Sequence, residues 1–171
     1  MSSIIKVDQI QLTDGTSPTA VDLGFAAGSV IQVVHNDLYS ASYSATTNTS
    51  FVEVNSAFRT SITPKYATSK ILVVGGLGVG IDRVGAQDAN GNIRIREINS
   101  GDIITQTGIR VYDRGGSGVY LQWGQTLSKL YSPATTSTLT YTWDFKLIVG
   151  QDIRANDENR ATYFTLYEIA G

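Results

Sequence analysis

The chain of 171 residues contains no cysteine, which excludes disulfides and thiolate metal sites. It contains one histidine, His35, so a catalytic site that needs an imidazole has a single candidate. No apolar run approaches the roughly 18 residues that span a bilayer, and we expect no membrane partner. The N-terminus has no basic segment followed by an apolar run, so we expect no secretory signal.

Charge is also scarce, and neither sign dominates. Charged residues make up 16% of the chain, and 13 basic against 15 acidic residues give a net charge of −2. A typical globular domain has about 25% charged residues. There is no positive excess to neutralise phosphates, so the composition argues against nucleic acid as a partner.

Hydroxyl residues and glycine are abundant instead. The chain has 19 Thr, 16 Ser and 17 Gly, but only three Pro. Thr favours strands because its branched Cβ fits a pleated surface. Many glycines are typical of frequent turns between short strands. The composition therefore favours an all-β protein, and the length fits one domain.

The clearest strand pattern covers residues 138–149. Apolar and mostly polar residues alternate there with period 2, which places six large apolar side chains on one face of the strand. A register slip of one residue would expose all six, so the facing of this strand is strongly specified. The six are Leu139, Tyr141, Trp143, Phe145, Leu147 and Val149.

Two further segments carry strand patterns of different kinds. Residues 52–62 alternate, and Pro64 ends that pattern because proline cannot donate to a sheet ladder. Residues 70–81 are apolar at both even and odd positions. A strand of this kind should be covered on both faces, by a second sheet or by a partner subunit. The interface residues we expect there are Ile71, Val73, Leu77 and Val79.

The remaining strand patterns recur every ten to fifteen residues without helical segments between them. Asn90-Gly91 is a good hairpin turn, and Gly115-Gly116-Ser117-Gly118 a second turn or loop. This spacing predicts a jelly-roll-like β-sandwich over residues 29–171. The other expected strands are 29–35, 93–98, 103–112, 119–127 and 162–169.

Residues 1–28 differ from the rest and are predicted to form an N-terminal extended arm. They contain one short apolar stretch followed by a polar, turn-rich segment, with too little apolar surface to fold alone. An arm of this kind needs another chain, or the body of the protein, to hold it. The docking residues we expect are Ile4, Ile5, Val7, Ile10 and Leu12.

The search for catalytic and cofactor motifs favours structural interpretations. No G-x-S-x-G sequence accompanies His35. Gly75-Gly76-Leu77-Gly78-Val79-Gly80 lacks the spacing of a nucleotide loop and precedes no helix, so close backbone approach within a strand explains it better. No pair of carboxylates has the pattern of a glycosidase. We expect no enzyme activity, no cofactor and no metal.

Two segments leave ligand binding open. The acidic segment 152–159 offers oxygen ligands for calcium, but its spacing does not match an EF-hand, and a solvated loop is the commoner case. The second segment combines aromatic side chains with an ion pair and a glycine loop, which suits sugar binding or half-buried strand ends. Its candidate receptor-binding residues are Tyr112, Asp113, Arg114, Tyr120 and Trp123.

Several strand-and-turn motifs resemble small virion structural proteins of marine tailed bacteriophages. The opening resembles phage fibre and appendage proteins, and later motifs resemble the bodies and ends of small virion proteins. The resemblance spans nearly the whole chain and includes no catalytic signature. The motifs are Ile4-Ile5-Lys6-Val7-Asp8-Gln9-Ile10, Asp14-Gly15-Thr16, Val30-Ile31-Gln32-Val33-Val34, Ser61-Ile62-Thr63-Pro64, Thr68-Ser69-Lys70-Ile71-Leu72-Val73, Ser132-Pro133-Ala134-Thr135-Thr136-Ser137 and Leu166-Tyr167-Glu168-Ile169-Ala170-Gly171.

The resemblance implies a virion location and a jelly-roll-like domain that is commonly trimeric. We therefore expect a homotrimeric fibre or appendage component that contributes to host attachment through a surface glycan. Its arm would anchor it to other virion proteins or intertwine the three chains. A capsid decoration protein that clamps the head is the first alternative. A carbohydrate-binding module is the second.

Overall fold

The structure is a computed structural model that describes residues 23–37, 44–83, 88–112, 119–156 and 162–171. These residues form β-strands and one short 3-10 helix, η1 (Ser56–Phe58), and they contain no α-helix. The all-β prediction is confirmed. The strands are β1 (Val30–Asp37), β2 (Ser44–Thr46), β3 (Val52–Glu53), β4 (Thr60–Ile62), β5 (Lys70–Arg83), β6 (Ala89–Glu97), β7 (Ile103–Val111), β8 (Val119–Tyr131), β9 (Leu139–Val149), β10 (Asp152–Ala155) and β11 (Tyr163–Ile169).

The strands pair as a nested set around the β6–β7 hairpin. Proceeding outward from that hairpin, β5 pairs with β8, β3 and β4 with β9, β2 with β10, and β1 with β11. All these pairs are antiparallel. The two halves of the chain thus form one long two-stranded ribbon.

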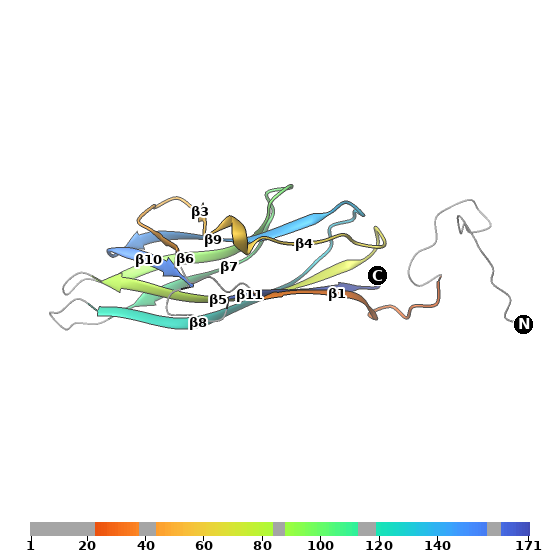
Figure 1. Ribbon diagram of the computed structural model, residues 1–171, viewed down its shortest axis with the longest axis horizontal. Helices are drawn as coiled ribbons and strands as arrows, with labels where there is room; N and C mark the ends of the chain where they lie inside the picture. Colours follow the sequence, from red (N-terminus) through yellow and green to blue (C-terminus); the bar gives the residue numbers. More distant parts are fainter. Residues whose placement is uncertain (1–22, 38–43, 84–87, 113–118, 157–161) are drawn as a thin grey trace, which may run out of the picture.

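Three further antiparallel strand pairings arrange this ribbon into two sheets. Strand β5 also pairs with β10 and β11, and β6 also pairs with β9. Sheet A then has the order β1-β11-β5-β8, with β10 and β2 continuing it beside the second half of β5. Sheet B has the order β3-β9-β6-β7, with β4 also on β9. The two sheets lie one over the other (Figure 1), and their strand order is that of a jelly roll.

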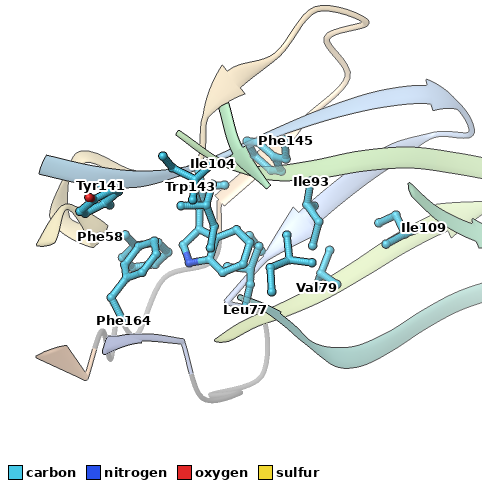
Figure 2. Close-up of a cluster of buried hydrophobic side chains, with 14 of the residues drawn as sticks. Phe58, Leu77, Val79, Ile93, Ile104, Ile109, Tyr141, Trp143, Phe145 and Phe164 are labelled. Carbon is cyan, nitrogen blue, oxygen red and sulfur yellow. The ribbon is translucent and has the colours of Figure 1, made fainter. Parts of the chain in front are cut away.

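The core lies between the sheets, and β5 and β9 each contribute five buried side chains to it. On β9, Tyr141 and Trp143 are fully buried and Phe145 is nearly so, as the alternation predicts. Trp143 stacks on Phe164 of β11 with ring centroids 5.6 Å apart, and both rings lie in the cluster of Figure 2. Val149, however, is 42% exposed, because a register shift between Leu147 and Val149 aligns Val149 with the outward-facing Asn90 of β6 and interrupts the alternation.

The glycines of β5 permit close packing, as their position within a strand suggests. A Cβ on Gly75 would lie 2.7 Å from Trp143 and 2.8 Å from Phe164 in the core. On the opposite face, a Cβ on Gly76 would lie 2.3 Å from the ring of Tyr163. These glycines admit aromatic rings on both faces of one strand.

The prediction of a hairpin turn at Asn90-Gly91 is wrong. Both residues lie inside β6, paired with β7 on one side and β9 on the other. A Cβ on Gly91 would lie 2.8 Å from the backbone oxygen of Lys146. The glycine therefore serves a close approach of two strands. The predicted turn at 115–118 lies outside the described residues.

Two other expectations also change. The segment 52–62 is not one strand, because η1 separates β3 from β4, and the side chain of Asn55 caps η1 by accepting from the amide of Ala57 at 2.9 Å. Residues 152–155, expected as an acidic loop, form β10 between β2 and β5. Ile153 and Ala155 are fully buried and point into the core. The strand has only four residues, which is too short for a period-2 alternation to be recognised in the sequence.

Candidate functional site

The outer face of sheet A carries an apolar row that crosses four strands. Successive register partners align Val33 of β1 with Tyr167 of β11, Tyr167 with Leu72 of β5, and Leu72 with Leu130 of β8. Period 2 places these side chains opposite the core-facing Ile71 and Leu166, so they point away from sheet B. We call Val33, Leu72, Leu130 and Tyr167 the outer apolar row.

This row is accessible to a partner. Val33 is 52% exposed and Leu130 48% exposed, whereas Leu72 and Tyr167 between them are half-buried. Val30 is 53% exposed and lies three residues before Val33 on β1. A register shift between Val30 and Gln32 pairs Val30 with Ile169, on the same face as Tyr167, so Val30 extends the apolar surface toward the start of the strand. Large apolar side chains that gather on one face of a sheet are typical of an interaction surface.

Toward the other end of β5, the same face carries aromatic rings over glycines. Tyr163 covers Gly76, and Tyr120 covers Gly80, where a Cβ would lie 2.3 Å from the phenol oxygen. The guanidinium of Arg154 lies 4.6 Å from the ring centre of Tyr120. Arg154 also forms ion pairs with Asp152 at 3.0 Å and with Asp82 at 3.4 Å. This half of the face is therefore polar and internally paired.

The outer face of sheet B is different, because charged and hydroxyl side chains occupy most of it, and its exposed apolar residues, Ile103, Ile148 and Val149, lie at strand ends. The carboxylate of Asp144 accepts hydrogen bonds from Arg94 and Arg96, each at 2.8 Å, and its side chain is only 2% exposed. The hydroxyls of Ser61 and Thr140 are also hydrogen-bonded, at 2.8 Å. An antiparallel sheet with a polar outer face is stable against water and needs no partner there.

The same network extends to Glu53 of β3. Arg59 donates two hydrogen bonds to its carboxylate, at 2.8 and 2.7 Å, and Thr142 donates a third at 2.7 Å. The Arg59 guanidinium is the main cause of a Glu53 pKa below the ordinary value of 4.5. This network links β3 to β9 and to the end of η1, and it is structural in character.

His35 takes part in a hydrogen-bonded line on the outer face of sheet A. Its Nδ1 lies 2.8 Å from the hydroxyl of Thr165, and its Nε2 lies 3.1 Å from a carboxylate oxygen of Asp37. A nucleophile, an imidazole and a carboxylate in line can activate a hydroxyl. The Asp37 side chain is 81% exposed, however, so water competes for its carboxylate. We interpret the line as a surface hydrogen-bond chain.

The predicted docking residues and the predicted interface residues have different outcomes in the structure. The expected docking residues Ile4, Ile5, Val7, Ile10 and Leu12 lie outside the described residues. The expected interface residues are instead at most 1% exposed and belong to the core between the sheets. They face inward because sheet B covers that side of β5, which leaves Leu72 and Val74 as its outward apolar residues. The four inward residues are Ile71, Val73, Leu77 and Val79.

The candidate receptor-binding residues do not form one surface. Tyr112 is 59% exposed beside the Arg110 guanidinium, whereas Tyr120 lies on the outer face of sheet A. Trp123 is three positions from Tyr120 on β8, so it faces the other side and packs against the core. Asp113 and Arg114 lie outside the described residues.

Within the described part of the chain, no group of three or more His, Asp or Glu side chains could hold a metal ion. The described residues also include no helix that is long and apolar enough to cross a membrane.

Sequence reasoning missed the outer apolar row. The apolar character of both faces of residues 70–81 was the available signal, since it indicated a second covered face without saying which residues would form it. Val33, Leu130 and Tyr167 come from segments far apart in the chain, and only strand pairing aligns them with Leu72.

Comparison with known proteins finds loose structural likenesses only. No protein-family model and no curated protein matches the chain. The VP2 subviral particle of infectious bursal disease virus is 14% identical over 82% of this chain, with a TM-score of 0.38. A D431N mutant of VP2 from the same virus, in T=1 particles, is 15% identical over 81%, with a TM-score of 0.37.

A structure described as CBM4 is 9% identical over 90% of this chain and 84% of its own, with a TM-score of 0.28. The chain spans only 33% and 36% of the two VP2 chains. Scores of this size do not establish a shared fold, and no function is carried over from these proteins.

Proposed function

We propose that this chain is a structural component of a virus particle, a homotrimeric subunit of a tailed-phage fibre or appendage. In this proposal the N-terminal arm, residues 1–28, anchors the protein to other virion proteins or intertwines the three chains, and the jelly roll projects outward. Host attachment would follow from contacts between its exposed loops and a surface glycan.

The observation that carries the proposal is the difference between the two outer faces of the sandwich. On sheet B, hydrogen-bonded polar side chains such as those of Asp144 and Thr140 lie along the middle of β9, and the exposed apolar residues, such as Ile103 and Val149, lie at strand ends. Sheet A presents the outer apolar row, with Val33 and Leu130 each about half exposed. A face of this kind fits a protein that works in an assembly. The resemblance of the sequence motifs to phage virion proteins supports the same role.

The oligomeric state and the location of the protein in the particle test this proposal. Light scattering after chromatography of the full chain should give three times the mass of one chain. Antibodies raised against the recombinant protein should label the tail or neck of the parent particle by electron microscopy. A stable monomer would contradict the trimer, and unlabelled particles would contradict the virion role.

The same imaging experiment separates an appendage from a capsid decoration protein. Label spread over the head lattice would replace the first proposal by the second. Particles that lack the protein should then release their genome at a lower temperature.

Host attachment is tested on the exposed Tyr112 beside Arg110. If this loop contacts a glycan, Tyr112→Ala should weaken binding of the full chain to host cells. Trp123→Ala is a less suitable variant, because Trp123 packs against the core and its loss would also lower stability.

A further inference from the structure

We propose that the outer apolar row of each copy receives the apolar stretch of the arm, residues 4–12, from a neighbouring copy. This inference deepens the assembly role proposed above and rests on it. It names the surface that takes up the arm and the chain that supplies it.

The first argument is the position of the row at the end of sheet A where the arm enters the fold. The amide of Gly28 donates to the carbonyl of Ala170 at 2.9 Å, and the amide of Ala170 donates to the carbonyl of Ser29 at 2.8 Å. Ala170 follows β11 directly, and Val30 and Val33 lie on β1, the first strand after the arm. The arm therefore joins the body beside the row.

The second argument is the direction in which the chain leaves the body. Residues 23–28 are all exposed, including Leu23 at 41% and Phe25 at 39%. Figure 1 shows this segment leading away from β1, past the C-terminal residue, and not back across sheet A. This path favours a neighbouring copy over the same chain.

The third argument is the length that the arm can span. Twenty-two residues precede Leu23 in the sequence. In extended form they would span about 70 Å. Strand β5, with 14 residues, measures about 46 Å at the rise of a strand. The arm is therefore long enough to cross to an adjacent subunit.

The fourth argument is chemical fit. Five of the nine residues from 4 to 12 are large aliphatic ones. They match the aliphatic side chains of the outer apolar row and would be buried by contact with it. Residues 1–22 also hold three aspartates against one lysine, and the exposed Lys70 stands beside Leu72 on the receiving face.

Cross-linking of the full chain tests this proposal directly, because the natural sequence has no cysteine to interfere. The variant Val7→Cys/Leu130→Cys would be treated with a short bis-maleimide. The matched control is Val7→Cys/Ile148→Cys, since Ile148 is 44% exposed but lies on β9 of sheet B. The single variant Val7→Cys measures links between two arms.

We expect covalent oligomers from the Leu130 pair, at a yield about tenfold above both controls, as a contact worth about 1.4 kcal/mol would give. A cross-link confined to single chains would show that the arm folds back on its own copy and would overturn the proposal. Equal yields from all three variants would overturn it as well.

A second pair of variants tests whether two copies instead contact each other directly through their outer faces of sheet A. Leu130→Gln should release the arm and weaken the oligomer about tenfold, whereas Ile148→Gln should not. If Leu130→Gln breaks the oligomer but the arm never cross-links to position 130, then two faces meet directly and the arm proposal fails. The virion role is judged separately, by immunolabelling of particles, so each can fail alone.

Discussion

Gly75 shows how a single residue controls the packing of this core. Its missing side chain leaves room for the rings of Trp143 and Phe164, which stack on each other. A methyl group at this position would overlap both rings. Glycine at position 75 is therefore a packing requirement, in agreement with the expectation that the glycine-rich run permits close approach within a strand.

We predict that Gly75→Ala lowers the free energy of unfolding by about 1–3 kcal/mol, the usual cost of overpacking. In a domain of this size that corresponds to a fall in Tm of about 2–4 °C per kcal/mol. Gly124→Ala on the neighbouring β8 is the matched control, because a Cβ there meets nothing within 4 Å. Thermal unfolding followed by circular dichroism measures both variants. Equal Tm values for the two would contradict the packing account.

Glu97 is a buried carboxylate that closes the β6–β7 hairpin. It accepts the amide of Ser100 at 2.6 Å and the amide of Thr140 at 2.9 Å. Burial raises the pKa of Glu97, but the hydrogen bonds from these amides outweigh burial and leave the pKa below its ordinary value of 4.5. The carboxylate thus links the hairpin to β9.

A pKa below its unfolded value means that Glu97 stabilises the fold fully at pH values above 4.5. We predict that this contribution is lost as the pH falls from about 4.5 through the folded-state pKa. Glu97→Gln should cost about 1–3 kcal/mol at pH 7, since one amide loses its acceptor, and the cost should shrink in acid. Urea unfolding at pH 7 and pH 3 measures the difference. An equal cost at both pH values would contradict the role of the charge.

At the scale of the elements, β5 is the strand on which sheet A depends. It pairs with β8 along one edge and with β11 and β10 along the other. Its inner face is buried against the core, and rings cover two of its outward glycines. In contrast, among the described strands β8 pairs only with β5, so its other edge is open to a partner.

We predict that the amides of β5 exchange with solvent only on global unfolding, because both edges are hydrogen-bonded. The amides of β8 should alternate between slow and fast, as those facing β5 and those facing away follow one another. Hydrogen exchange read by NMR resolves this pattern. Uniformly slow exchange along β8 would instead indicate a strand pairing between copies at that edge.

At the scale of the whole molecule, the nested strand pairs explain how a cysteine-free chain encloses a core although its described residues include no α-helix. The β6–β7 hairpin supplies local contacts, and every later pair joins residues farther apart in the sequence. The jelly roll does not reveal a function by itself, since many functions share it. The difference between the two outer faces is what bears on function.

If the protein assembles through sheet A, its thermal stability should depend on its concentration. We predict that the Tm of the full chain rises with protein concentration, because association stabilises the folded state by mass action. Leu130→Gln should abolish this dependence, while Ile148→Gln on sheet B should retain it. Differential scanning calorimetry at several concentrations measures the effect. A Tm independent of concentration in the natural chain would contradict assembly through this face.

The sequence by itself determined the all-β class, the positions of most strands and the inward face of the first five alternating residues of β9. Period-2 alternation is a local property, and the large burial free energy of Trp143 and its neighbours permits one facing only. The sequence also indicated that residues 70–81 would be covered on two sides.

Only the tertiary structure decided which residues of that strand face the core and which face outward. When both faces are apolar, alternation cannot distinguish them, and the choice depends on partners distant in sequence. The same reason places Asn90-Gly91 inside a strand and 152–155 in β10, because close approach to β9 and pairing with β5 outweigh local turn preference. The outer apolar row itself exists only because strand register aligns Val33, Leu72 and Leu130 across sheet A.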